Sequence, residues 1–220
     1  MLVTINGVDK TGKTTAINGL LSGNESKITV LPRITFFDPR WGKNDLQEDW
    51  YFRTDNVPEF MDMMSVSLGR LSEHVYNIKP TNHVYIQDRG IMAIMSSFKG
   101  FVRLKTGIGI NEVDDYINRY CDNHKITIIY PNEDVSILLS PTNDIDKAVN
   151  FTLSKMIARE PTLKEPFIAT YGQYQKYFNE ELKKFTEKFT HIVDCNQTIP
   201  EVRESILCAI NTICGRQIVK

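Results

Sequence analysis

The sequence predicts an α/β fold of three layers, in which helices flank a five-stranded parallel sheet. Short apolar runs alternate along the chain with longer segments whose apolar residues recur at helical spacing. The first apolar run leads directly into a glycine-rich turn and a helix-compatible segment, an order in which parallel sheets bind anions. These two observations predict β-α units and a ligand site at the carboxyl ends of the strands.

The predicted strands are the apolar runs at residues 2–6, 28–31, 84–87, 135–139 and 191–194. The run at 126–130 is also strand-like and is the alternative to 135–139 for the fourth strand.

Helices are predicted between these runs by apolar residues at three- and four-residue spacing, at 14–21, 59–77, 92–104, 112–123 and 144–158. A long helix then carries an aromatic stripe, which we interpret as core packing rather than a base-stacking platform. Its members are Phe167, Tyr171, Tyr174, Phe178, Leu182, Phe185 and Phe189. A last helix begins near Thr198, where Thr198 and Glu201 have the spacing of a capping box.

Length and composition bound the class of protein. A chain of 220 residues suffices for one domain with a substantial core. The net charge of −1 excludes a broad basic surface for nucleic acid. No apolar run approaches the roughly 20 residues that span a bilayer, and no charged leader precedes the first strand, so we expect a cytoplasmic protein. The four cysteines lack C-x-x-C spacing, which favours reduced thiols over a zinc site.

The turn after the first predicted strand fits the phosphate-binding pattern G-x-x-x-x-G-K-[ST]. Glycine permits backbone angles that turn successive N–H groups towards an anion, and the following helix adds the positive end of its dipole. The lysine of this pattern reaches the β- and γ-phosphates of ATP and the next hydroxyl holds Mg²⁺, so Lys13 is a catalytic candidate and Thr14 a metal ligand. The predicted ATP-binding residues are Gly7, Lys10, Thr11, Gly12, Lys13, Thr14 and Thr15.

A second polar pair, Asp88-Arg89, follows the third predicted strand, where ligands bind in open parallel sheets. An acid at this point can hold Mg²⁺ or a water bound to it, so Asp88 is the second candidate metal ligand. The adjacent arginine can grip a phosphate through two parallel hydrogen bonds. A strand-end salt bridge is the alternative, but the preceding phosphate loop favours a functional pair.

The loop stretch Gly7-Val8-Asp9-Lys10-Thr11-Gly12-Lys13-Thr14-Thr15 resembles that of the thymidylate kinases with a basic residue inside the loop. This resemblance implies that Asp9 hydrogen-bonds the 3′-hydroxyl of the acceptor sugar. It also implies that Lys10 helps to stabilise the transferring phosphoryl group. Asp88-Arg89 resembles the family's Asp-Arg-Tyr motif, whose arginine binds the acceptor phosphate, although Gly90 replaces the tyrosine here.

Three further acceptor-binding residues are expected from the same resemblance. Arg33 resembles the arginine that binds the monophosphate, with Arg40 as the alternative. Phe36, with Phe37 as the alternative, is the candidate ring that stacks on the base. Arg70 lies in a segment similar to the Ala-Asp-Arg-x-x-His helix of bacterial members, whose arginine lines the acceptor pocket. For each residue the alternative is a solvated or surface-paired side chain.

A small lid at about residues 155–166, within a single kinase domain of residues 1–220, is also implied by the resemblance to P-loop kinases. Lid cations in this superfamily close over the donor phosphates and exclude water. Arg159 is the leading candidate for this catalytic role, and a solvated basic helix end is the alternative. The number of residues between the fourth strand and this lid matches the resembled family better for a strand at 135–139 than for one at 126–130.

The sequence therefore predicts an enzyme that transfers the γ-phosphoryl group of ATP, with Mg²⁺, to a deoxynucleoside monophosphate, with dTMP the expected acceptor. A deoxynucleoside kinase is the first alternative, because Asp38-Pro39-Arg40-Trp41 partly matches the Glu-Pro and Trp of those enzymes and offers Asp38 as a base. A regulatory nucleotide-binding protein without transferase activity is the second. The expected partners are ATP and the acceptor. The resemblance also implies a homodimer formed through helix packing, for which the Met-rich helix at 59–77 is a candidate face.

Overall fold

The computed structural model describes residues 1–22, 24, 26–42, 56–79 and 83–214. Its single sheet comprises β1 (Leu2–Asn6), β2 (Ile28–Val30), β3 (Val84–Asp88), β4 (Val135–Ser140) and β5 (His191–Asp194). The strands are all parallel, in the order β2-β3-β1-β4-β5. This arrangement confirms the predicted fold class, and the run at 126–130 is not a strand.

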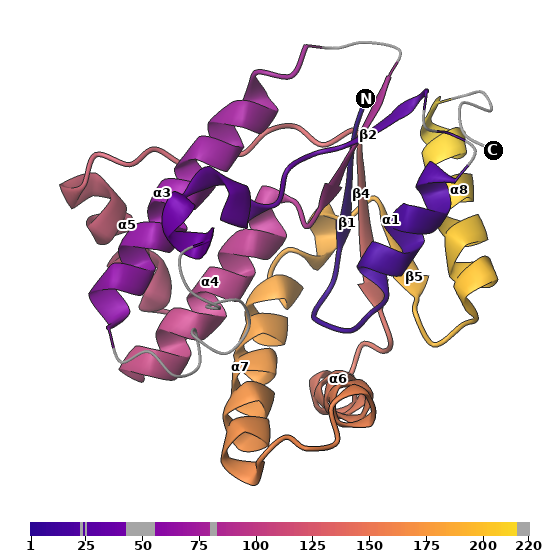
Figure 1. Ribbon diagram of the computed structural model, residues 1–220. Coiled ribbons are helices and arrows are strands. Elements are labelled where there is room, and N and C mark those ends of the chain that lie inside the picture. The colour runs from indigo at the N-terminus through magenta and orange to yellow at the C-terminus, as the bar shows by residue number, and fades with distance from the viewer. Residues whose placement is uncertain (23, 25, 43–55, 80–82, 215–220) are drawn as a thin grey trace.

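Helices cover both faces of the sheet (Figure 1). On one face lie α1 (Lys13–Leu21) and α8 (Ile199–Cys214), and on the other α3 (Val57–Tyr76), α4 (Ile91–Thr106) and α7 (Glu165–Lys183). Outside α4 packs α5 (Val113–Asn123), and α6 (Ile145–Arg159) lies beyond the carboxyl end of β4. Short 3-10 helices are η1 (Ile34–Phe37), η2 (Pro39–Gly42) and η3 (Thr186–Lys188).

The central strand β1 has two unlike faces, because side chains alternate along a strand. Val3 and Ile5 are fully buried in the apolar core beneath α1 and α8. Thr4 and Asn6 point to the other face, where the Asn6 side-chain oxygen accepts a hydrogen bond of 2.8 Å from the backbone N–H of Gly90. This bond attaches the start of α4 to the sheet, directly after Asp88 and Arg89.

The aromatic stripe extends beyond its helix, so the prediction of one helix through Phe189 is wrong. Helix α7 ends at Lys183, and Phe185 and Phe189 flank η3. The backbone bonds there tighten to i→i−3, as in Phe185 N–H to the Leu182 carbonyl at 3.1 Å and Lys188 N–H to the Phe185 carbonyl at 2.8 Å. A 3-10 turn keeps nearly the same apolar spacing as an α-helix, which is why periodicity did not reveal the change.

The methionines of α3 do not form an exposed face. Met61, Met63 and Met64 are at most 6% exposed and pack inside the chain's own core, so they are not available to a second copy. The expected homodimer stays a prediction, without this face as its contact. Within the part of the chain that the structure describes, no helix is both long and apolar enough to cross a membrane.

Candidate functional site

The phosphate loop joins β1 to α1 through backbone angles that glycine favours. Gly7 has φ +135°, and a Cβ there would lie 2.5 Å from the Leu139 carbonyl oxygen. Gly12, which precedes α1, has φ +86°. The Thr11 hydroxyl donates a 2.9 Å hydrogen bond to the Val8 carbonyl and closes the loop on itself. The loop therefore has the local geometry that the motif predicts.

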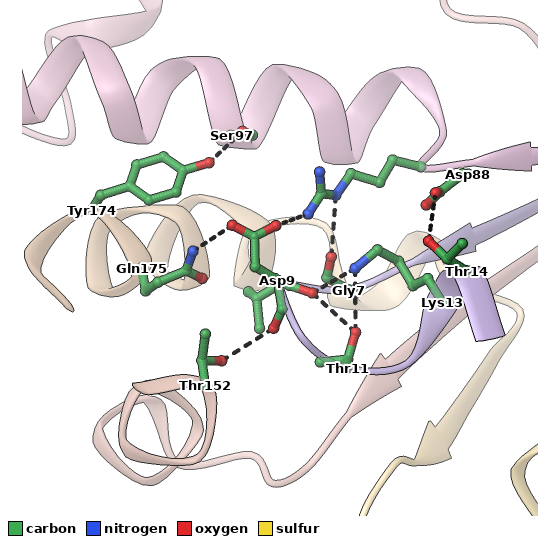
Figure 2. Close-up of polar contacts among 12 residues, drawn as sticks. Gly7, Asp9, Thr11, Lys13, Thr14, Asp88, Ser97, Thr152, Tyr174 and Gln175 are labelled. Atoms are coloured by element: carbon green, nitrogen blue, oxygen red, sulfur yellow. Dashed lines mark hydrogen bonds and ion pairs between the residues drawn. The ribbon is translucent and has the colours of Figure 1, made fainter. Parts of the chain in front are cut away.

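Lys13 lies folded into the loop rather than out into solvent (Figure 2). Its ammonium donates to the Val8 carbonyl at 2.6 Å and to the Thr11 hydroxyl at 3.3 Å, and the residue is only 7% exposed. Burial and the neighbouring Arg89 lower the pKa of Lys13 to about 7. A polyphosphate in the loop would add its negative charge to that of Asp9 and Asp88 and so favour the charged form of this lysine.

The two predicted metal ligands are brought together. The Thr14 hydroxyl donates to Asp88 at 3.5 Å, across the gap between the start of α1 and the end of β3. The other carboxylate oxygen of Asp88 is buried and has no hydrogen-bond partner among the described residues. Hydroxyl and carboxylate oxygens are ligands that Mg²⁺ accepts beside substrate phosphates, so this pair fits the ion. Arg33 reaches the same place, with its guanidinium 3.2 Å from Thr14 and 3.3 Å from Asp88.

The Asp9 carboxylate accepts hydrogen bonds from three side chains, of which Figure 2 shows the one from Gln175. Arg89 donates to one carboxylate oxygen, while Tyr171 and Gln175 donate to the other at 2.9 and 2.8 Å. Burial alone would raise the pKa of Asp9, but the positive charges of Arg89 and Lys13 outweigh it and lower that pKa to about 2. Asp9 and Arg89, both predicted to bind the acceptor, are thus an ion pair beside the loop that is charged at neutral pH.

Sequence reasoning missed three side chains that bind Asp9 or its backbone. The aromatic stripe predicts core packing for Tyr171, and nothing in the sequence marks Gln175, which is fully buried one turn later on α7. Thr152 of α6 donates to the Asp9 carbonyl at 3.3 Å. The one available signal was the spacing of Tyr171 and Gln175, which places a buried amide on the same helix face as the aromatic stripe.

Gly90 departs from the resembled motif because its space is taken. A Cβ on Gly90 would meet the Glu133 carboxylate and the Thr4 methyl group. Glu133 in turn accepts a 2.6 Å hydrogen bond from the Thr4 hydroxyl. A tyrosine at position 90 is therefore incompatible with Glu133 in this position.

The segment after β2, which the sequence predicts to bind the acceptor, is attached to α3. Arg70 donates to the Phe37 carbonyl at 2.9 Å, and the Phe37 ring lies 5.5 Å from the His74 ring. Phe36 is 76% exposed. Arg70 therefore supports the segment that carries Phe36, while the structure places neither side chain against the phosphate loop.

Asp38, the alternative catalytic base, is 3% exposed and is held by Arg40. Arg40 donates from Nε to both carboxylate oxygens at 3.0 Å, and its other end reaches Asp62 of α3 at 2.7 Å. Hydrogen bonds from Arg40 lower the pKa of Asp38. Asp38 is consequently an ionised, paired group.

The lid prediction falls on the connection between α6 and α7. Helix α6 continues through Arg159 and α7 begins at Glu165, so the non-helical connection is 160–164. Arg159 is exposed at the end of α6, and no hydrogen bond or ion pair joins it to the described residues of the phosphate loop.

Lys10, the other predicted catalytic cation, has φ +61° within the loop.

Comparisons with known proteins agree with this geometry at the level of the fold. No protein-family model and no curated sequence matches the chain. A solved structure of deoxyadenosine kinase from M. mycoides, with dCMP and a flexible dCDP bound, is similar at a TM-score of 0.65 and 17% identity, covering 96% of this chain and 100% of that chain. Thymidylate kinase from Candida albicans is similar at a TM-score of 0.59 and 16% identity, covering 96% of this chain and 92% of that chain. This chain therefore has the fold that nucleoside and nucleotide kinases share.

Proposed function

We propose that this protein is a nucleoside monophosphate kinase that transfers the γ-phosphoryl group of ATP to a deoxynucleoside monophosphate, with dTMP the expected acceptor. The observation that carries the proposal is the charge arrangement beside the phosphate loop. In addition to the loop's own lysines, two arginines lie there. Arg33 contacts Thr14, and Arg89 contacts Asp9. Guanidinium groups at this point suit an acceptor that itself bears a phosphate.

On the donor side, the loop N–H groups and Lys13 bind the ATP phosphates, with Thr11 and Thr15 completing the loop and the start of α1. Thr14 and Asp88 hold Mg²⁺, which neutralises phosphate charge when bound. Lys10 and, after lid closure, Arg159 add positive charge at the transferring group.

On the acceptor side, Arg89 and Arg33 bind the monophosphate and Asp9 accepts from the sugar hydroxyl. Arg70 and Phe36 shape the entrance and meet the base. A phosphate whose second pKa lies near about 6 is already ionised at neutral pH, so no general base is required. Catalysis then consists of positioning and charge neutralisation.

A deoxynucleoside kinase is the second candidate, and two observations favour it. The M. mycoides deoxyadenosine kinase is among the similar folds, and Asp38 sits beside Arg40 in the partly matching Asp-Pro-Arg-Trp segment. Against it, Arg40 lowers the pKa of Asp38, and a carboxylate with a lowered pKa is a weak base.

A coupled ADP-release assay decides between these functions. ATP and Mg²⁺ are supplied with dTMP, dUMP, dCMP, dGMP, AMP, thymidine or deoxycytidine. Turnover confined to a monophosphate supports the proposal and names the base. Turnover confined to a nucleoside, abolished by Asp38→Asn, overturns it in favour of the second candidate. Lys13→Ala should lose turnover by orders of magnitude with the fold intact, and ATP binding without any turnover would indicate a regulatory protein instead.

A further inference from the structure

The Asp9 carboxylate is held by one face of α7. Tyr171 and Gln175 are four residues apart, so both project from the same side of the helix, and both donate to the same carboxylate oxygen. Tyr171 is 6% exposed and Gln175 is fully buried. A buried amide and hydroxyl cost free energy unless they are hydrogen-bonded, so the bonds to Asp9 offset part of the cost of burying these two groups.

The Gln175 amide orientation is determined by its partner. An ionised carboxylate only accepts hydrogen bonds, so the Gln175 nitrogen must face Asp9. The Gln175 side-chain oxygen then lies buried without a partner among the described residues. Apolar packing would be served equally well by leucine, and the glutamine therefore points to a role through Asp9.

Asp9 in turn holds Arg89, whose backbone has φ +69°. One terminal nitrogen of the Arg89 guanidinium donates to Asp9, and its Nε lies 3.5 Å from the Gly7 carbonyl. The guanidinium also lies over the ring of Phe178, a third residue of α7, at 5.7 Å from the ring centre. A guanidinium has five N–H donors, so Arg89 keeps free donors for a phosphate while it remains bound to Asp9.

We propose that Tyr171 and Gln175 are positioning residues for the acceptor phosphate: they orient Asp9, and Asp9 orients the guanidinium of Arg89. This inference rests on the proposed function, because it takes Arg89 as the ligand of the acceptor phosphate. It adds to that function the requirement that α7, which directly follows the 160–164 connection, shapes the acceptor site. Lys13 and Thr14 hydrogen-bond to Val8, Thr11 and Asp88, so we expect ATP binding to depend less than acceptor binding on Tyr171 and Gln175.

The kinetic test uses Tyr171→Phe, which removes only the hydroxyl, and Gln175→Leu, which keeps the volume. Each variant should raise KM for dTMP roughly tenfold, the equivalent of about 1.4 kcal/mol, while KM for ATP stays unchanged. Gln173→Leu, an exposed position on the same helix, is the matched control and should leave both constants unaltered. Equal increases in both KM values, or no increase in either, would overturn the positioning role.

A second readout needs no acceptor and separates this inference from the proposed function. The Asp9 carboxyl carbon is followed by NMR as the pH is lowered. In the unmodified protein it should stay ionised down to the acid limit of the folded state, and in Tyr171→Phe it should begin to titrate within that range. Unchanged titration overturns the inference. Absence of turnover by the unmodified protein on every monophosphate overturns the proposed function, whatever the titration shows.

Discussion

Asp9 contributes to stability in a way that depends on pH. Its pKa is about 2 in the folded protein against an ordinary value of 3.8, so folding favours the ionised carboxylate. Such a group stabilises the fold at pH values above its unfolded pKa, and this contribution is lost as the pH falls through the folded pKa. A shift of this size corresponds to about 2 kcal/mol of unfolding free energy.

We therefore expect Asp9→Asn to unfold more easily than the parent at neutral pH. The difference in unfolding free energy should shrink as the pH falls from about 4 towards 2, where the parent carboxylate is also protonated. Urea unfolding of both proteins at a series of pH values measures this difference in unfolding free energy. A difference that stays constant over this range would show that the Asp9 charge is not what stabilises the loop.

Arg33 occupies the position between the two predicted metal ligands, and its side chain is 62% exposed. If Thr14 and Asp88 hold Mg²⁺ as proposed, a guanidinium there would compete with the ion and would have to move before it could bind an acceptor phosphate. Arg33→Gln should therefore tighten Mg²⁺·ATP binding several-fold and weaken dTMP binding, by comparable free energies of about 1 kcal/mol each.

Calorimetric titration of each ligand checks the Arg33 prediction without any turnover. Arg119→Gln, on the exposed face of α5, is the control and should change neither affinity. Weaker Mg²⁺·ATP binding in Arg33→Gln would mean that this arginine serves the donor phosphates.

Helices α4 and α7 approach so closely that one glycine decides their separation. A Cβ on Gly100 would lie 2.8 Å from the Phe178 backbone nitrogen, and backbone cannot move aside as a side chain can. Gly100→Ala should therefore destabilise the protein by about 1–3 kcal/mol. Because α7 also carries Tyr171 and Gln175, the same change should raise KM for dTMP more than KM for ATP. Thermal unfolding and steady-state kinetics measure the two effects.

Gly172 of α7, which faces Leu153 of α6, provides the comparison for Gly100. The site of a Cβ on Gly172 of α7 lies 3.3 Å from a methyl group of Leu153, a flexible side-chain end. Gly172→Ala should consequently be tolerated, and a helix interior gains from alanine. If both alanine variants behaved alike, backbone approach between α4 and α7 would not be the controlling feature.

At the scale of elements, local signals were sufficient for the strands. The runs at 2–6 and 191–194 are β1 and β5 as predicted, because short apolar segments between turn residues have few other solutions. The end of α7 was missed because α and 3-10 turns share their apolar spacing.

The phosphate loop could be placed because its residues are contiguous. Tyr171 and Gln175 could not, because they lie 162 and 166 residues from Asp9 in the chain and no local pattern marks such a contact.

At the scale of the whole molecule, ion pairs with buried members connect the helices on the side of the sheet opposite α1. Arg103 of α4 lies 3.2 Å from Glu181 and 2.8 Å from Glu180, both on α7. Lys99 of α4 pairs with Asp114 of α5. The Arg103 and Lys99 side chains are each 8% exposed and that of Glu181 is fully buried. These pairs join α4 to α5 and to α7, the helix that carries Tyr171 and Gln175.

Removing one member of such a pair leaves the other charge buried and uncompensated. Arg103→Ala should therefore lower the unfolding free energy by about 3 kcal/mol, the low end for a buried pair, because Lys184 still contacts Glu181 at 2.7 Å. The double change Arg103→Met with Glu181→Leu should recover most of that loss, since it removes both charges and fills the space.

Urea unfolding of the single variants Arg103→Met and Glu181→Leu and of the double variant provides the double-mutant cycle for this network. A loss below about 1 kcal/mol for Arg103→Ala would place the pair with solvent-screened surface bridges instead. Recovery in the double variant, with KM values for ATP and dTMP close to those of the parent, would show that packing alone can align α4 and α7. Recovery of stability with a raised KM for dTMP would instead assign the charges a second role, which is to hold α7 in the register that Tyr171 and Gln175 need.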